Sequence, residues 1–282
     1  MLIPTVSQVL SSASQRLSFS QEAPRLDAEV LVAHALDYSR TQLYLYSDKR
    51  LTEADCLAID ALVDRRCNGE PIAYIVGGKE FWSLNFKVTP DTLIPRPETE
   101  HLVELALARI PEDEAWQIVD LGTGSGAIAI AIANERPACQ LLAIDKSEAA
   151  LMVARDNAET LGVKNVCFRK SDWFAALNAA LFHMVVSNPP YIARQDKHLT
   201  RGDVASEPKN ALVAGVDGLD DVRKIIKQAK AHLLPEGYLL LEHGWNQAAD
   251  VKAIFEEASY KDICTHKDLA GLARISQGAW GL

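Results

Sequence analysis

Residues 116–126 read Trp-Gln-Ile-Val-Asp-Leu-Gly-Thr-Gly-Ser-Gly, and a run of small and β-branched residues follows up to Asn134. The apolar residues before Gly122 are typical of a buried strand, and Ala127 begins a predicted helix. The glycines therefore lie at a strand-to-helix turn, where they let the backbone turn tightly while the helix presents unpaired N–H groups. Taken alone, such a loop is either a tight turn or a ligand cradle.

Strands and helices alternate on both sides of this loop. The predicted strands are 117–121, 141–144, 166–169, 184–187 and 238–241, and the predicted helices are 98–109, 127–134, 148–161 and a segment near 219–233. Alternation at this spacing predicts an α/β fold with a doubly wound, mostly parallel sheet. We assign this fold to residues 98–282.

Helical patterns dominate the beginning of the chain. Apolar residues recur at near-helical spacing after Pro24, and Thr52 with Asp55 forms a capping-box pattern for a further helix that Gly69 would end. Residues 1–75 are therefore predicted to form a small all-α domain.

The stretch between the two predicted domains has a different character. Residues 72–88 are rich in aromatic and β-branched side chains broken by two glycines, a pattern that suggests a strand pair. Three prolines between residues 90 and 97 then forbid a regular helix. Residues 76–97 are predicted to be a β-hairpin and Pro-rich connector.

Composition excludes several classes of protein. The chain is 48% hydrophobic and 24% charged, which fits a soluble globular protein and not a disordered one. The N-terminus lacks the basic and apolar regions of a secretion signal, and the longest apolar run is far shorter than the ~20 residues that cross a bilayer. Five cysteines, an odd number with no C-x-x-C pair, indicate a reducing cytoplasm rather than a disulfide framework or a zinc site.

The net charge of the chain indicates which classes of partner it can bind. The net charge of −9 disfavours a broad nucleic-acid footprint, because phosphate contacts need Lys and Arg, and an acidic enzyme would more readily meet a basic protein partner. Seven histidines are scattered without ligand spacing, so no catalytic metal is expected.

Acidic and aromatic residues at the next two strand ends extend the predicted ligand site. Asp145 follows its strand about 20 residues after the glycine loop, where a carboxylate can accept hydrogen bonds from ribose hydroxyls. It could instead cap the next helix, for which Ser147 is an equally good candidate. Asp172 and Trp173 could accept from an adenine amino group and offer an aromatic face, and the alternative is a capping Asp and a core Trp.

Asn188-Pro189-Pro190-Tyr191 directly follows the predicted strand 184–187. The prolines fix the backbone and leave carbonyl oxygens as acceptors. If a planar amide or amino nitrogen points its N–H groups at the Asn188 side-chain oxygen and the Pro189 carbonyl, its electron density rises, while Tyr191 stacks on the planar group. A turn alone would also explain an isolated tetrapeptide of this kind.

These motifs resemble those of known families. Asp120-Leu-Gly-Thr-Gly-Ser-Gly126 is similar to the first motif of Rossmann-like class I methyltransferases, in which the third glycine comes one residue earlier than in dinucleotide folds, and this implies S-adenosylmethionine as cofactor. Nearly the whole chain resembles the PrmC/HemK family, bacterial methyltransferases that act on peptide chain release factors. The most discriminating segments are Gly78-Lys-Glu-Phe-Trp-Ser-Leu84 and Leu93-Ile-Pro-Arg-Pro-Glu-Thr-Glu100.

The resemblance implies N5 methylation of the glutamine in the Gly-Gly-Gln motif of class I release factors, which tunes translation termination, with the helical domain helping to recognise the partner. The implied cofactor-binding residues are Gly122, Thr123, Gly124, Ser125, Gly126, Asp145, Asp172, Trp173 and Asn188. The glutamine amide is then held by Asn188, Pro189, Pro190 and Tyr191, and the catalytic residues among them are Asn188, Pro189 and Tyr191. Two roles, shaping the pocket and packing the connector, stay open for Phe81, Arg96 and Glu98.

Three alternatives remain. An adenine-N6 DNA or RNA methyltransferase would flip a base against the same acceptors but needs a basic surface. A ribosomal-protein glutamine methyltransferase is disfavoured only by the connector segments, and a noncatalytic cofactor-binding protein would not need Asn188. We expect a monomer that contacts neither nucleic acid nor membrane.

The chain departs from the family pattern at two places. Ala205-Ser206 stands where relatives commonly have Arg and an aromatic residue, and Leu272-Ala273 stands where an Arg-Asp pair is usual. Both departures bear on partner contacts or on the final hairpin, and they leave the chemical motifs intact.

Overall fold

The computed structural model describes residues 3–18 and 23–281, and the chain divides into two units. Met1–Gly78 and Thr200–Ser206 form the helical unit, and Lys79–Leu199 and Glu207–Leu282 form the α/β unit. The chain therefore passes from one unit to the other three times.

Side-chain capping marks the start of three helices of the helical unit. The helices are α1 (Val6–Leu17), α2 (Pro24–Leu36), α3 (Arg40–Leu45), α4 (Glu53–Cys67) and α5 (Ile72–Val76). A capping box starts each of α1, α3 and α4, and the predicted box of Thr52 and Asp55 is confirmed. The apolar faces of α1, α2 and α4 pack together around Leu10, Leu31 and Ile59, as expected for a helical region at the N-terminus.

A segment distant in sequence completes the helical unit. The 3-10 helix η2 (Gly202–Ser206) contains Asp203, whose carboxylate accepts a hydrogen bond from Arg66 Nη1 at 2.6 Å. Arg66 Nε also donates to Asp27 at 2.9 Å, and the Arg66 side chain is only 9% exposed. Because a buried guanidinium needs acidic partners, this ion pair ties residues 200–206 to α4.

The predicted strand pair at 72–88 is wrong in its first residues, since Ile72–Val76 is α5. Pro71 precedes this helix, and Gly77 ends it with a φ of +74°, which glycine adopts without strain. The β-branched residues made the run resemble a strand, whereas packing against α2 and α4 decides its conformation. The hairpin strands β1 (Gly78–Phe81) and β2 (Leu84–Lys87) follow directly.

A seven-stranded sheet forms the centre of the α/β unit. Its order is β5-β4-β3-β6-β7-β9-β8, and within the described residues β9 runs antiparallel to both neighbours while the other pairs are parallel. The mostly parallel sheet is therefore confirmed. The strands are β3 (Gln117–Leu121), β4 (Gln140–Asp145), β5 (Val166–Lys170), β6 (Phe182–Ser187), β7 (Leu233–Glu242), β8 (Lys261–Lys267) and β9 (Ala273–Trp280).

Strand β7 begins earlier than predicted. The sequence predicted a helix to about residue 233 and a strand from 238, but the helix ends at Ala229 and Leu233 already pairs with Phe182 of β6. Pro235 and Gly237 made these residues unlike a strand. The register shifts in this part of the β6–β7 pairing, and such irregular positions tolerate proline.

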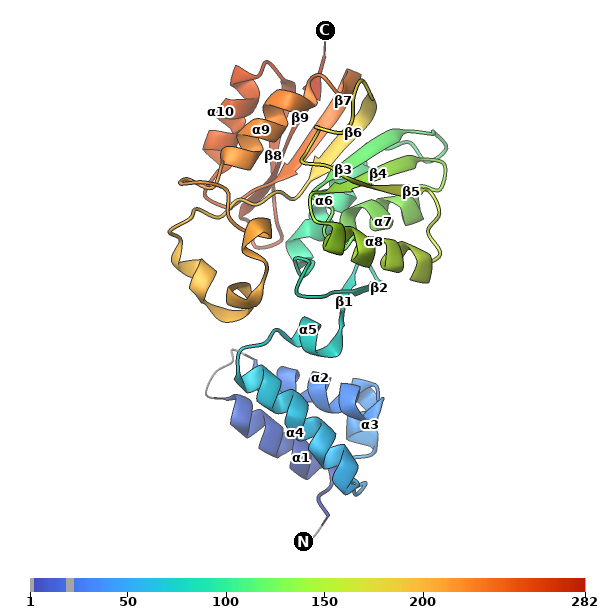
Figure 1. Cartoon of the computed structure of the whole chain (residues 1–282), viewed down its shortest axis with the longest axis vertical. Helices are drawn as coiled ribbons and strands as arrows, with labels where there is room; N and C mark the ends of the chain where they lie inside the picture. Colours follow the sequence, from blue (N-terminus) through green and yellow to red (C-terminus); the bar gives the residue numbers. More distant parts are fainter. Residues whose placement is uncertain (1–2, 19–22, 282) are drawn as a thin grey trace. The chain divides into compact units, whose positions relative to one another are not determined.

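Helices cover both faces of the sheet, so the doubly wound arrangement is confirmed (Figure 1). On one face lie α6 (Pro97–Leu107), α7 (Ala127–Glu135) and α8 (Glu148–Thr160), and on the other lie α9 (Asp220–Ala229) and α10 (Ala248–Glu257). Successive residues of β3 serve different faces, because Ile118 packs in the first core and Val119 in the second. None of the helices in residues 3–18 and 23–281 is long and apolar enough to span a membrane.

Neighbouring parallel strands end in register at one edge of the sheet. Leu121 of β3 pairs with Ile144 of β4 and with Ser187 of β6, and Ser187 pairs with Leu241 of β7. The residues that follow these strands therefore start from one edge, which is the edge where open α/β sheets bind ligands.

Asn157 of α8 joins the glycine loop to the β1–β2 hairpin. Its Nδ2 donates to the carbonyls of Lys87 at 3.0 Å and Ser125 at 2.9 Å, and its Oδ1 accepts from the Lys87 N–H at 2.8 Å. Only 2% of Asn157 is exposed. Water therefore has little access to replace these bonds.

Asn157→Ala is expected to lower the free energy of unfolding of the α/β unit by about 2–4 kcal/mol, because one buried backbone group of Ser125 and two part-buried groups of Lys87 lose their partner, at roughly 1–3 kcal/mol for a buried group and less for a part-buried one. Urea unfolding followed by circular dichroism measures this loss. Asp156→Ala is the matched control, since Asp156 pairs with Lys87 Nζ at the surface and the change should stay below about 1 kcal/mol. Equal losses in the two variants would contradict the role of Asn157.

Candidate active site

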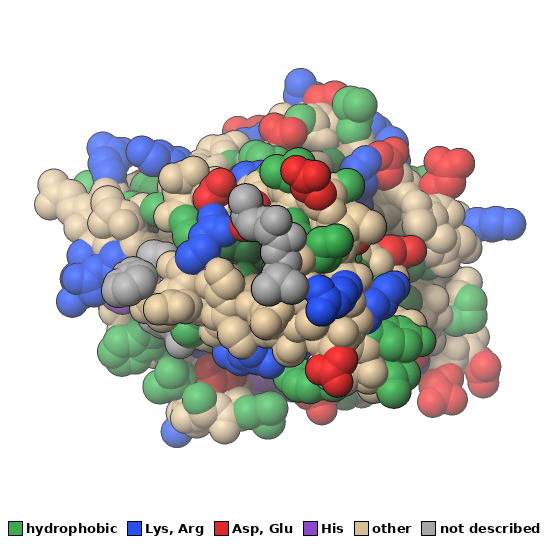
Figure 2. Space-filling model, turned by 90° about the horizontal axis from the view of Figure 1, so that it is seen from below, with side chains coloured by type: hydrophobic (Ala, Val, Ile, Leu, Met, Phe, Trp, Pro, Cys, Tyr) green, Lys and Arg blue, Asp and Glu red, His purple; other side chains and the backbone are tan. Residues whose placement is uncertain are grey.

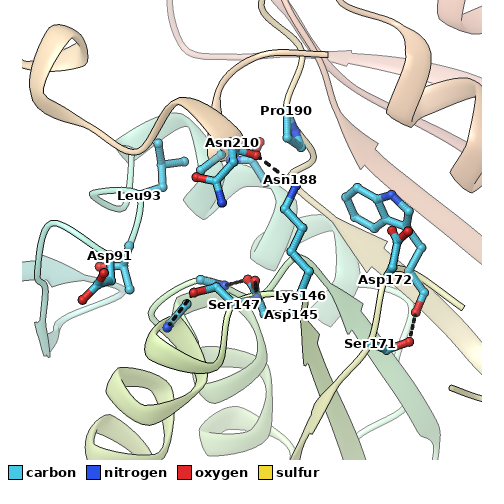
Figure 3. A pocket seen from close by; sticks show the side chains of 16 residues that line it. Asp91, Leu93, Asp145, Lys146, Ser147, Ser171, Asp172, Asn188, Pro190 and Asn210 are labelled. Atoms are coloured by element: carbon cyan, nitrogen blue, oxygen red, sulfur yellow. Dashed lines mark hydrogen bonds between the residues drawn. The ribbon is translucent and has the colours of Figure 1, made fainter. Parts of the chain in front are cut away.

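One cavity lies at the edge where β3, β4, β5 and β6 end (Figure 3). The space that its lining residues enclose is about 650 Å³, including the part that is open to solvent. The lining residues that follow these strand ends or lie in them are Gly122, Gly124, Asp145, Lys146, Ser147, Ser171, Asp172, Trp173, Asn188 and Pro190. Four segments far apart in sequence thus contribute to one site.

Two positions in the loop require glycine. Gly122 has a φ of +73°, and an added Cβ would lie 3.4 Å from the Trp173 ring. Gly126 has a φ of +85°, and its Cβ would lie 2.8 Å from Ile130 Cδ1 and 3.1 Å from Ala154 Cβ. A side chain at Gly126 would therefore strain the backbone and push α7 and α8 apart.

Asp145 is held in place by the backbone around it. Its Oδ2 accepts from the Gly124 N–H at 3.0 Å, and its Oδ1 accepts from the Ser147 N–H at 2.8 Å. Ser147 is the residue that caps α8, because its hydroxyl accepts from the Ala150 N–H. The capping alternative for Asp145 is therefore wrong, and its carboxylate stands at the cavity wall beside the glycine loop.

Trp173 is both a core residue and part of the cavity wall. It is 7% exposed and packs with Phe174, while its Nε1 donates to Asp221 at 3.2 Å. Asp172 is exposed, and both of its oxygens lie 3.1 Å from Lys224 Nζ. An aromatic face and a carboxylate thus stand together at the end of β5.

Asn188 belongs to a chain of hydrogen bonds that reaches into the core. Its Nδ2 donates to Thr99 Oγ1 at 3.1 Å, Thr99 donates to Glu242 Oε2 at 2.7 Å, and the Tyr191 hydroxyl donates to Glu242 Oε1 at 3.2 Å. Among the described residues, none donates to Asn188 Oδ1 or to the Pro189 carbonyl oxygen. Two acceptors therefore remain available at this strand end.

The structure brings seven of the predicted site residues to the cavity, and five others do not line it. Those at the cavity are Gly122, Gly124, Asp145, Asp172, Trp173, Asn188 and Pro190. Those that do not line it are Thr123, Ser125, Gly126, Pro189 and Tyr191. The side chains of Thr123 and Ser125 are buried, and the Thr123 hydroxyl donates a hydrogen bond to the Asp120 carboxyl group.

The three connector residues with open roles have different surroundings. Phe81 lies in the core, 1% exposed, with its ring centroid 6.0 Å from that of Phe86. Arg96 pairs with the buried Glu207, and Glu98 lies in the first turn of α6. None of the three lines the cavity among the described residues.

Sequence reasoning missed the residues that close the cavity opposite the strand ends. They are Asp91, Thr92 and Leu93 of the connector and Asn210 and Ala211 of the 3-10 helix η3 (Lys209–Ala211). Glu207 links the two segments, because its carboxylate accepts from the Ile94 N–H at 3.3 Å and from Arg96. The pair Glu207-Pro208 was the available sequence signal.

The residues present fit the cofactor that the loop motif implies. The Asp145 carboxylate suits ribose hydroxyls, and Trp173 with Asp172 suits an adenine ring and its amino group. An added Cβ at Gly124 would meet nothing within 4 Å, so the loop borders open space into which a ligand can approach the backbone.

Two family models match the chain. The PrmC N-terminal domain matches residues 8–77, and the methyltransferase small domain matches residues 101–261. Among curated proteins, the release factor glutamine methyltransferase of Escherichia coli K12 is 48% identical over 93% of this chain and 94% of its own. The release factor glutamine methyltransferase of Coxiella burnetii is 47% identical over 96% of this chain and 97% of its own.

Solved structures share the fold at lower identity. A methyltransferase from Pyrococcus furiosus has a TM-score of 0.55 at 20% identity, covering 78% of this chain and 98% of its own. The T. thermophilus 16S rRNA N2 G1207 methyltransferase in complex with AdoMet and guanosine has a TM-score of 0.53 at 18% identity, covering 72% of this chain and 49% of its own. These likenesses confirm the Rossmann-like methyltransferase fold.

Asp120, a fully buried residue of β3, is expected to make the stability of the fold depend on pH. Its carboxyl is fully buried, and burial raises its pKa to about 7, although the Thr123 hydroxyl bonds it at 2.6 Å and acts in the opposite direction. The unfolded value lies near 4. Stabilisation by the protonated group is therefore complete below about pH 4 and is lost as the pH rises toward 7.

The difference in unfolding free energy between the wild type and Asp120→Asn should accordingly fall between about pH 4.5 and 7, by at most about 1.4 kcal/mol per pH unit, and should be flat above about pH 8. Urea unfolding without ligand measures both proteins. Other carboxyls are common to the two and cancel in the difference. A difference that does not change with pH would show that Asp120 does not titrate in this way.

Proposed function

The chain belongs to the PrmC family of release factor glutamine methyltransferases, and on this premise we propose that it methylates the side-chain amide nitrogen of a glutamine in a peptide chain release factor. S-adenosylmethionine is the methyl donor. The curated relatives carry this activity in their names, and the chain covers nearly their whole length.

One observation carries the chemistry of this proposal. Asn188 Oδ1 and the Pro189 carbonyl are acceptors without a donor among the described residues, and Asn188 lines the same cavity as the glycine loop and Asp145, with Pro189 next to it in the chain. A primary amide has two N–H groups, so two acceptors can hold it in one orientation. Such a pair of acceptors suits an amide nitrogen that must face a methyl donor.

The residues proposed to bind the cofactor surround the rest of the cavity. Asp145 accepts hydrogen bonds from the ribose, since each of its oxygens has a further lone pair beyond the bonds to Gly124 and Ser147. Trp173 lies against the adenine, and Asp172 accepts from the adenine amino group. The backbone of the glycine loop approaches the amino-acid end of the molecule.

In the proposed reaction the chain raises the reactivity of a poor nucleophile. Bound S-adenosylmethionine supplies an electrophilic methyl group. Asn188 Oδ1 and the Pro189 carbonyl accept the two N–H groups of the glutamine amide, which increases electron density on nitrogen and directs its lone pair toward the cavity. Transfer would form the new C–N bond while the methyl–sulfur bond of the donor breaks and its electron pair stays on sulfur, and the nitrogen would give up one proton to solvent. Tyr191, held by Glu242, is proposed to keep the planar amide from rotating.

The nucleic-acid alternative has less support. The net charge is −9, and on the face seen in Figure 2 the Lys and Arg side chains are interspersed with acidic and hydrophobic ones. A methyltransferase that flips an adenine out of a duplex needs Lys and Arg along the phosphate backbone. Both observations favour a protein substrate.

We also propose which glutamine is methylated and which part of the chain recognises the release factor. The target is the glutamine of the Gly-Gly-Gln motif in class I release factors, and the helical unit recognises the partner. Support comes from Tyr44, Leu45 and Leu57, which are 58%, 71% and 65% exposed on that unit and which a protein partner can cover. We propose that the enzyme acts as a cytoplasmic monomer and contacts neither nucleic acid nor membrane.

Labelled methyl transfer tests the function. The purified chain should label a class I release factor, and mass spectrometry should place the methyl group on the Gly-Gly-Gln glutamine. Duplex DNA and ribosomal protein are the alternative acceptors, and a release factor with Ala in place of that glutamine is the control. Label on DNA but not on the release factor would refute the substrate assignment.

Asn188→Ala should reduce kcat by about 10²–10³-fold, because it removes one acceptor for the reacting nitrogen. The dissociation constant for S-adenosylmethionine should change little, and calorimetry measures it separately. Asn246→Ala is the matched control, since Asn246 is exposed and does not line the cavity. Unchanged turnover in Asn188→Ala would remove Asn188 from the mechanism.

A further inference from the structure

We propose that Thr99 and Glu242 are positioning residues that hold the Asn188 side chain with its oxygen toward the substrate amide. The inference rests on the proposed function, because it explains how the acceptor in that function is oriented. Thr99 lies in the first turn of α6, and Glu242 is the last residue of β7. Neither lines the cavity, so both act through Asn188 and Tyr191.

The orientation follows from counting protons. A carboxylate only accepts, so the single hydroxyl proton of Thr99 goes to Glu242 Oε2, at 2.7 Å. The Thr99 oxygen can then only accept, and Asn188 must present its NH₂ group there, at 3.1 Å. Rotating the amide by 180° would set two acceptors against each other. The Asn188 oxygen is therefore the atom left for the substrate.

The same carboxylate also holds Tyr191, the second residue proposed to contact the substrate amide. Glu242 Oε1 accepts from the Tyr191 hydroxyl at 3.2 Å, so its two oxygens hold the two ends of the Asn188–Tyr191 segment. Thr99 is 4% exposed and Glu242 is 1% exposed. Water therefore has little access to compete for these bonds.

Protonation of Glu242 would remove the constraint. Burial raises the pKa of Glu242 to about 7, and the negative charge of Glu98 acts in the same direction, while Thr99, Tyr191 and Arg274 act against it. A protonated Glu242 can donate to Thr99, whose proton is then free to bond the Asn188 oxygen. The Asn188 side-chain amide can then rotate by 180°, and the substrate amide would meet the NH₂ group of Asn188 in place of its oxygen.

Kinetics with conservative variants tests the positioning role. Thr99→Val keeps the shape and removes the hydroxyl, so kcat should fall roughly 10–100-fold with little change in cofactor affinity. Thr99→Ser should recover most of that loss because it restores the hydroxyl. Ser276→Ala is the matched control, since it removes a buried bond to His243 on the same sheet without touching Asn188, and its kcat should stay near the wild-type value. Wild-type kcat in a folded Thr99→Val protein would overturn the proposal.

The pH dependence gives a second test. In the wild type, kcat should rise through an ionisation near pH 7, and in Glu242→Gln it should be lower and lack that ionisation. An unchanged profile in Glu242→Gln would contradict the proposal.

A readout without substrate separates this proposal from the proposed function. In the ¹⁵N-labelled full chain, the Asn188 side-chain resonance, assigned by its absence in Asn188→Ala, should shift with a midpoint near pH 7 and should not do so in Glu242→Gln. Absence of this shift in the wild type would refute the positioning role of Thr99 and Glu242. This measurement does not depend on whether the Thr99→Val variant folds. Failure to methylate a release factor would refute the function and leave this measurement unaffected.

Discussion

The common register of parallel strands is the constraint on which the site depends. Because β3, β4, β6 and β7 pair so that their ends lie within one residue of one another, the residues that follow these strands lie at one edge of the sheet. The glycine loop follows β3, Asp145 ends β4 and Asn188 follows β6. Glu242 is the last residue of β7. The helices contribute by holding these ends: α8 supplies Asn157 to the loop, and α6 supplies Thr99 to Asn188.

Much of this was accessible from the sequence because it is encoded locally. An apolar strand ending in glycines, an acidic residue after the next strand and Asn-Pro-Pro-Tyr after a third are patterns within single segments, and parallel pairing brings them together without further information. Local patterns gave the wrong prediction at Ile72–Val76, where β-branched residues form a helix because they pack against other helices. They also gave the wrong start of β7, because Leu233 pairs with β6 although Pro235 follows it.

The rest of the site arises from contacts that no local pattern records. Thr99 and Glu242 are 143 residues apart, and nothing in either segment predicts that they bond. Asp91 and Asn210 likewise reach one cavity from opposite halves of the chain. An asparagine also has two chemically different ends of nearly equal shape, so its role is defined only when a neighbour of fixed polarity is known.

The ion pair between Arg66 and Asp203 has a consequence for the order in which the protein can be made. The ribosome synthesises Arg66 long before Asp203, since 137 residues separate the two in sequence. A nascent helical unit therefore begins without Asp203 and, among the described residues, with Asp27 as the acidic partner of this guanidinium, and it gains η2 only after the strands β3 to β6 have been synthesised. The helical unit, most of which precedes the α/β unit in the chain, thus reaches its final set of contacts late, and a fragment ending at Gly78 would lack the contacts of η2 permanently.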